Sequence, residues 1–190
     1  MVSTLTLPAF AKTNLSLRVL GKREDGYHEL ETIFQTVSLH DTIRISAIES
    51  SEIAFSCDDR SLPTNTHNLV VRAATALRDR VNRKRGARIR LEKRIPTHAG
   101  LGGGSSDAAA TLIGLARLWE LSTTREELGE LAAKLGADVS FFLYGGTARG
   151  TGIGDRIEPL EDAPETFLLI VKPNANVSTA MLTKRWKNRP

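Results

Sequence analysis

A glycine-rich stretch near the middle of the chain has the composition of a phosphate-binding loop. Residues 96–112 read PTHAGLGGGSSDAAATL, in which four glycines within positions 100–104 precede Ser105 and Ser106. Glycine lets the backbone approach a phosphate closely, and a helix beginning near Ser106 would present unpaired N–H groups and a positive dipole end. The serine hydroxyls are further donors for phosphate oxygens. The alternative interpretation is a strand-to-helix turn in which Ser106 is the N-cap.

Two common phosphate-loop templates do not fit this stretch. A Walker A loop ends in Gly-Lys-Ser/Thr, whereas Gly104 is followed by two serines. The dinucleotide pattern requires a sixth-position glycine, and counting from Gly100 or Gly102 places Ser105 or Asp107 there. Asp107 would also repel a nearby triphosphate, so we expect its carboxylate to point away or to help hold a cation.

Composition and charge narrow the class of protein. The chain has 190 residues, 41% hydrophobic and 25% charged, which is typical of a soluble globular protein. A net charge of +4 suits an acidic substrate but is weak support for nucleic-acid binding. We interpret the basic stretch from Arg78 to Arg94 as a solvent-exposed face. The single cysteine, Cys57, excludes a disulfide framework within one chain. Without a secretory signal or a membrane-length apolar window, we predict a cytoplasmic protein with no membrane partner.

The periodicity of the chain predicts the elements that must position the loop. Apolar spacing indicates helices over 68–81 and 107–119, and Thr124 with Glu127 forms a capping box for a helix that Gly136 closes. Other segments predict extended structure over 3–20 interrupted by Pro8, a turn at 24–27, paired strands at 42–48 and 52–56, a strand at 87–95, a short apolar run at 138–144, a hairpin at 145–160 and a buried strand at 167–173. Strands that precede helices and then recur indicate an α+β fold.

Several segments together resemble the GHMP kinases, a superfamily of small-molecule kinases. Residues 96–112 resemble their second signature, and PAFAKTNLSLRVLGKREDGYHELETIFQTVSLHD at 8–41 resembles the N-terminal signature of the branch that phosphorylates 4-diphosphocytidyl-2-C-methyl-D-erythritol. THNLVVRAA at 66–74, LGADVSFFLYGGTARGTGIGDRIEPL at 135–160 and the region around Ser178 fit the same branch. The resemblance covers nearly the whole chain, and the combination of motifs is highly specific.

The resemblance implies a domain organisation. Residues 1–163 would form the GHMP-kinase N-terminal domain, with the fold of ribosomal protein S5 domain 2, and 164–190 a last strand and the start of a connection. Because the family's chains are longer and carry a third glycine-rich signature, the C-terminal ferredoxin-like lobe is expected to be missing or only begun. We therefore expect weak or absent kinase activity from these residues alone, and an exposed apolar surface where a second lobe would pack.

The resemblance also implies a reaction and two catalytic residues. ATP would donate its γ-phosphoryl group to the 2-hydroxyl of the cytidylylated methylerythritol, a step of the non-mevalonate isoprenoid pathway. Lys12 and Asp138 match the catalytic positions. We hypothesise that Asp138 accepts the proton of the hydroxyl while Lys12 keeps this aspartate ionised and stabilises charge at the reacting oxygens. The residues alone allow a helix N-cap for Asp138 and a solvated strand lysine for Lys12. Mg²⁺ is expected with the nucleotide, without a dedicated protein metal site.

Binding residues carry over in the same way. Asn14, Tyr27, His28 and Thr179 match substrate-contacting positions, and stacking of cytosine on Tyr27 is physically sound. The family usually has an aromatic residue where this chain has Thr183, so Trp186 compensates or base binding is weaker. The implied ATP-binding residues are Asn68 near the adenine and the phosphate loop Pro96, Thr97, His98, Ala99, Gly100, Leu101, Gly102, Gly103, Gly104, Ser105 and Ser106.

Three other functions are compatible with parts of the sequence. A nucleotide-binding module without catalysis would use the loop for affinity alone. A nucleic-acid-binding domain has the basic stretch as its only support. A GHMP kinase for mevalonate, homoserine or a sugar is disfavoured by DGYHEL, which belongs to the cytidylyl-substrate branch. We therefore predict a small-molecule substrate, no nucleic-acid partner, and a monomer or weak dimer.

Overall fold

A long antiparallel strand pair forms the centre of the fold. The computed structural model describes residues 4–81 and 85–173. Strand β1 (Thr4–Lys22) pairs with β2 (His28–Ile48) along its whole length, through three register shifts. The turn between them contains Gly26 with φ +85°, which confirms the predicted turn at 24–27.

The other edge of β2 pairs with two different strands. Its C-terminal half pairs antiparallel with β4 (Gly86–Glu92), and β3 (Ile53–Cys57) runs parallel to β4. Its N-terminal half pairs with β5 (Thr147–Thr151), which forms a hairpin with β6 (Arg156–Pro159), as predicted. The sheet order is β3-β4-β2-β5-β6, with β1 on the other side of β2.

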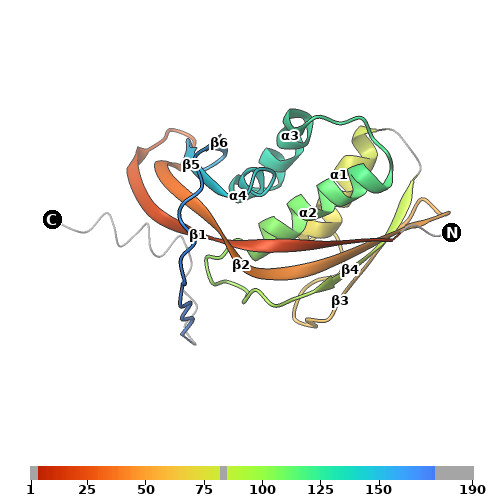
Figure 1. Cartoon of the computed structure of the whole chain (residues 1–190). Helices are drawn as coiled ribbons and strands as arrows, with labels where there is room; N and C mark the ends of the chain where they lie inside the picture. Colours follow the sequence, from red (N-terminus) through yellow and green to blue (C-terminus); the bar gives the residue numbers. More distant parts are fainter. Residues whose placement is uncertain (1–3, 82–84, 174–190) are drawn as a thin grey trace.

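The helices cover one face of this sheet (Figure 1). They are α1 (Leu69–Arg80), α2 (Gly103–Leu118), α3 (Arg125–Leu135) and α4 (Ala137–Phe141). The main core lies between the helices and the sheet, where side chains such as Leu77, Ile89 and Leu112 are fully buried. This arrangement confirms the predicted α+β fold. The predicted caps are also present: Thr124 and Glu127 form the capping box of α3, and Gly136 ends that helix.

Two predictions about the strands are wrong. Pro8 does not interrupt β1 but pairs in register with Thr42. Within the described residues β1 has β2 as its sole partner, and an edge strand tolerates a residue that lacks an N–H donor. Segments 42–48 and 53–57 do not pair, because β4 lies between them. Helix α1 connects β3 to β4, and a helical crossover of this kind produces a parallel pair.

Two alternative interpretations, in which Ser106 and Asp138 are helix N-caps, are also wrong. Helix α2 begins at Gly103, and its N-cap is Gly102 in the left-handed conformation, without a side-chain cap hydrogen bond. Ser106 is therefore inside the helix, where its N–H donates to the carbonyl of Gly102, and it is not the N-cap. Asp138 is likewise in the first turn of α4, whose N-cap is Gly136.

The segment after β6 differs from the predicted buried strand. Residues 160–173 have no regular secondary structure, and Phe167 and Leu169 are almost fully exposed. A strand needs backbone hydrogen-bond partners, and none of the described strands pairs with 167–173. Apolar composition alone therefore did not make this segment a strand. In the part of the chain covered by the structure, no helix has the length and apolar character needed to span a membrane.

Candidate functional site

The glycine-rich loop connects the end of β4 to the start of α2 in a backbone conformation that favours glycine. Gly100 and Gly102 have φ values of +73° and +71°. A Cβ on Gly102 would lie 2.7 Å from the ring of Phe142, so a side chain at this position meets both backbone strain and a clash. The N–H of Lys12 donates to the carbonyl of Leu101 at 2.9 Å and attaches the loop to β1.

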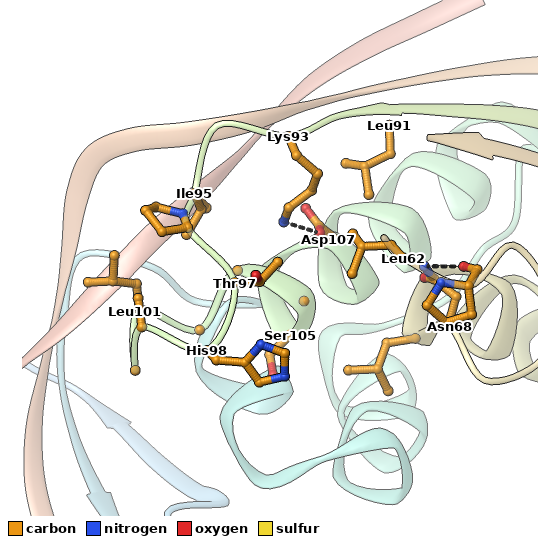
Figure 2. A pocket seen from close by; sticks show the side chains of 18 of the residues that line it. Leu62, Asn68, Leu91, Lys93, Ile95, Thr97, His98, Leu101, Ser105 and Asp107 are labelled. Atoms are coloured by element: carbon orange, nitrogen blue, oxygen red, sulfur yellow. Dashed lines mark hydrogen bonds and ion pairs between the residues drawn. The ribbon is translucent and has the colours of Figure 1, made fainter. Parts of the chain in front are cut away.

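A pocket of about 450 Å³ lies over this loop and the N-terminus of α1 (Figure 2). The N-terminus of α2 borders this pocket, and the unpaired backbone amides of a helix N-terminus favour phosphate binding. Asn68 and all the predicted loop residues from Pro96 to Ser105 line the pocket. Ser106 does not line it: its side chain is buried and borders a separate pocket of about 100 Å³ beside β1. The role of Ser106 in ATP binding stays a prediction.

Asn68 shapes the wall of the pocket. Its Oδ1 accepts the N–H of Val70 at 2.9 Å as the N-cap of α1, and its Nδ2 donates to the carbonyl of Pro63 at 2.9 Å. Both polar ends of the side chain are therefore used in holding α1 to the segment before it. Asn68 lines the pocket, its cap role explains its burial, and its place near the adenine stays a prediction.

Lys12 and Asp138 come together from distant parts of the chain, beside the loop. The ammonium of Lys12 lies 3.4 Å from Oδ2 of Asp138 and donates to Oδ1 of Asn14 at 2.8 Å. It also lies 5.2 Å from the centre of the Phe34 ring. The lysine side chain is 8% exposed and that of Asp138 is 37% exposed, so the aspartate can be reached from solvent.

Asn14 is itself oriented by a chain of hydrogen bonds. Its Nδ2 donates to Oγ1 of Thr32 at 2.6 Å, and the Thr32 hydroxyl donates to the carbonyl of Ser16 at 2.7 Å. These bonds determine which end of the Asn14 amide faces Lys12. The result is a fixed cation between the glycine loop and an accessible carboxylate, an arrangement suited to moving a phosphoryl group from the loop to a hydroxyl beside Asp138.

The predicted substrate residues Tyr27 and His28 lie at the β1–β2 turn. Tyr27 is 60% exposed, and its N–H donates to Oδ1 of Asp25 at 3.1 Å. Arg23 pairs with both Asp25 and Glu29, which braces the turn. Nε2 of His28 is buried without a hydrogen-bond partner among the described residues. Thr179, Thr183 and Trp186 lie outside the described residues.

Sequence analysis missed a buried charged cluster below the loop. Lys93 contacts the carboxylates of both Asp41 and Asp107, and the structure thereby answers the question of Asp107: its carboxylate pairs with a lysine. One signal was present. Alternate residues of a strand point to the same face of a sheet, and Asp41 and Lys93 stand two positions from the buried residues Ile43 and Leu91. A charged residue on the apolar face of a strand indicates a buried partner of opposite charge.

The cluster shifts the pKa values of its members. Burial raises the pKa of Asp107 to about 7, against the opposing charge of Lys93, and Asp41 adds to the rise. Burial lowers the pKa of Lys93, but the two carboxylates outweigh this and hold it above its ordinary value.

No group of three or more histidine, cysteine, aspartate or glutamate side chains within residues 4–81 and 85–173 is arranged to hold a metal ion. The carboxylate of Asp138 is the accessible acidic group beside the loop. One carboxylate and substrate phosphates are a donor set that Mg²⁺ accepts.

Comparison with known proteins agrees with this geometry. Residues 68–146 match the family model described as the GHMP kinases N terminal domain. A Bacillus cereus protein named 4-diphosphocytidyl-2-C-methyl-D-erythritol kinase is 48% identical over 93% of this chain and 61% of its own length, and a Bacillus anthracis protein of the same name is 47% identical over the same shares. The chain thus spans about 61% of the length of the curated relatives it matches.

Solved structures show the same fold. A crystal structure of 4-(cytidine 5'-diphospho)-2C-methyl-D-erythritol kinase matches with a TM-score of 0.72 and 45% identity, over 82% of this chain and 55% of that one. The Methanococcus jannaschii mevalonate kinase matches with a TM-score of 0.63 and 18% identity, over 84% of this chain and 56% of that one, which is a likeness of fold alone.

Fold and sequence together make the chain similar to the GHMP kinases, and residues 68–146 match the model of their N-terminal domain. Within that family, the proteins it matches at 45–48% identity are named as kinases of cytidylylated methylerythritol.

Proposed function

We propose that this chain is the nucleotide-binding and catalytic part of an ATP-dependent kinase that phosphorylates the 2-hydroxyl of 4-diphosphocytidyl-2-C-methyl-D-erythritol. The observation that carries the proposal is the placement of Lys12, which contacts Asp138 through its side chain and the glycine loop through its backbone. Similarity to relatives that bear the name of this kinase supports the choice of substrate. The reaction would belong to the non-mevalonate route to isoprenoid precursors.

Each residue would have a role that its surroundings allow. The pocket over residues 96–105 would hold the nucleotide, with its phosphates at the N-terminus of α2. Asp138 would accept the proton of the substrate hydroxyl, and Lys12 would offset the charge that develops on the transferred phosphoryl group. Mg²⁺ would accompany the nucleotide and neutralise phosphate charge, with Asp138 within reach as a ligand. Asn14, Tyr27 and His28 would bind the cytidylylated alcohol.

The domain boundary is part of the proposal. Residues 1–163 would form the catalytic domain, because the strands end at Pro159 and the residues that follow are attached to β5. Leu160 donates its N–H to the carbonyl of Thr147, and the carboxylate of Asp162 accepts the N–H of Thr147. A cytoplasmic location and a monomeric or weakly dimeric state stay predictions from the sequence.

The decisive experiment measures ATP binding and phosphoryl transfer separately. The purified chain is incubated with radiolabelled ATP, Mg²⁺ and the cytidylylated alcohol, and the wild type is compared with Asp138→Asn. We expect the turnover of this variant to be at least 100-fold below that of the wild type, whatever the wild-type rate. ATP affinity should stay within about threefold, because removing a general base affects the chemical step. Asp155→Asn, in the β5–β6 turn, is the matched control and should retain full turnover.

Unchanged turnover in Asp138→Asn would contradict the assignment of the base. ATP binding with no phosphorylated product, both by this chain and by a fusion of it to the C-terminal part of the Bacillus cereus relative, would instead indicate a nucleotide-binding module.

A further inference from the structure

Three charged side chains, from β2, from α2 and from the segment after β4, meet beside the glycine loop. Asp41 from β2 is fully buried, Asp107 from α2 is 2% exposed, and the side chain of Lys93, just after β4, is 8% exposed. Figure 2 shows Lys93 reaching down to Asp107, and its ammonium lies 2.8 Å from Oδ2 of that residue. The same ammonium also contacts Oδ2 of Asp41.

The second oxygen of Asp41 holds the first residues of the loop. Its Oδ1 accepts the N–H groups of Arg94 and Ile95, the latter at 2.8 Å. These two residues are the point at which the chain leaves β4 and turns toward Pro96. Asp41 therefore fixes the direction in which the loop begins, from a strand that lies outside the loop itself.

The opposite end of the loop is held by the same lysine. Asp107 follows the first turn of α2, so the Lys93–Asp107 pair joins two residues that flank the whole loop. A Cβ on Gly103 would lie 3.2 Å from the Lys93 ammonium, which shows that the lysine passes directly under the N-terminus of the helix. The loop is thus closed at its base by a buried ion pair.

Stability alone is a weak reason for such a cluster. Removing charges from water costs several kcal/mol per ion, and well-packed apolar residues often replace a buried ion pair without loss of stability. Ion pairs and charge-assisted hydrogen bonds do, however, impose direction, which apolar contacts do not. Both ends of the loop would need such a fixed direction if its amides are to meet phosphate oxygens at hydrogen-bond distance.

We propose that Asp41, Lys93 and Asp107 are positioning residues that clamp both ends of the phosphate loop and thereby determine its affinity for the triphosphate of a nucleotide. The inference rests on the proposed function, in which this loop binds ATP. Lys93 and Asp107 line the pocket, whereas Asp41 does not and therefore acts through the loop, without contact with the ligand.

Asp41→Asn is the sharpest test because this residue does not touch the pocket. The amide keeps the volume of the side chain, but its NH₂ group would face the Lys93 ammonium and lose that bond. We expect the dissociation constant for MgATP, measured by isothermal titration calorimetry, to rise at least tenfold in protein whose circular dichroism shows it folded. Asp79→Asn, on the exposed side of α1, is the matched control and should bind within twofold of the wild type.

Hydrogen exchange distinguishes positioning from a general loss of stability. In Asp41→Asn the N–H groups of Arg94 and Ile95 keep only a neutral acceptor that Lys93 no longer holds in place. Their amides should therefore exchange at least tenfold faster, while that of Leu77 in the core of α1 keeps its protection. A purely structural role would speed up exchange at all three amides together and would leave ATP affinity unchanged in folded protein.

A second variant covers the case in which Asp41→Asn does not fold. In Lys93→Met/Asp107→Asn the ion pair is neutralised, while Asp41 keeps its two backbone hydrogen bonds. This variant should also bind MgATP at least tenfold more weakly; because Lys93 and Asp107 line the pocket, it tests whether the cluster sets the affinity, and Asp41→Asn tests whether it does so through the loop. Affinity within twofold of the wild type, in either folded variant, would overturn the proposal. If the wild-type chain does not bind ATP at all, the proposed function fails, whereas local acceleration at residues 94 and 95 would still support the clamp.

Discussion

The buried carboxyl of Asp107 predicts a specific pH dependence of folding stability. Burial, against the opposing charge of Lys93, raises the pKa of this group from its ordinary 3.8 to about 7 in the folded chain. The folded protein therefore keeps the proton on Asp107 at a pH at which the unfolded chain has already lost it. Stability from this group is complete below about pH 3.8 and is lost as the pH rises toward and through 7.

The size of the effect follows from the two pKa values. A difference of one pH unit in pKa corresponds to about 1.4 kcal/mol, so the change from 3.8 to about 7 amounts to at most about 4 kcal/mol over the whole range. Between pH 5 and pH 8, the range in which the protein can be handled, roughly 2–3 kcal/mol of it should be lost. Asp107→Asn has nearly the same shape, offers Lys93 an oxygen acceptor, and does not titrate.

Urea unfolding followed by far-ultraviolet circular dichroism at pH 5, 6, 7 and 8 measures this difference. The free energy of unfolding of Asp107→Asn, relative to the wild type, should increase by roughly 2–3 kcal/mol from pH 5 to pH 8. Groups that titrate in both proteins cancel in this comparison. Asp79→Asn, which changes an exposed carboxylate, should follow the wild type within about 0.5 kcal/mol. Parallel wild-type and Asp107→Asn curves would refute the reasoning, because they would show that Asp107 titrates alike in the folded and unfolded chains.

Two further predictions concern the loop and a helix cap. Gly102→Ala should destabilise the fold by about 2 kcal/mol and weaken MgATP binding at least tenfold, because φ is +71° and the new Cβ would lie 2.7 Å from Phe142. Gly129→Ala, at a position in α3 with no atom near the new Cβ, should instead stabilise by about 0.5–1 kcal/mol; equal effects of the two changes would rule out the loop argument. Thr124→Ala should lower the free energy of unfolding by about 1 kcal/mol, because it removes the side-chain acceptor for the N–H of Glu127. Thr123→Ala, just outside the helix, is its control, and an equal loss there would show that the capping box is not the cause.

Local signals in the sequence were sufficient for several parts of the fold. The bounds of α1 and α3 follow from their caps, because Asn68, Thr124 and Gly136 act on backbone groups within a few residues of themselves. The turn before Tyr27 and the glycine loop follow in the same way from residues that tolerate positive φ. The pairing of Lys12 with Asp138 could be anticipated only through the family resemblance, since the two residues lie far apart in the chain.

The sequence by itself therefore determined the α+β class, most helix ends and the glycine-rich loop, since these depend on interactions between near neighbours in the chain. Tertiary structure alone decided that β3 pairs with β4, that Pro8 fits inside an edge strand, and that 167–173 is not a strand. It also decided the partners of Asp107. From the sequence alone, an aspartate next to the glycine-rich loop is electrostatically unfavourable. In the folded chain, β2 and the end of β4 bring Asp41 and Lys93 against it. The electrostatic energy of a buried charge depends on such groups, which only the folded chain assembles.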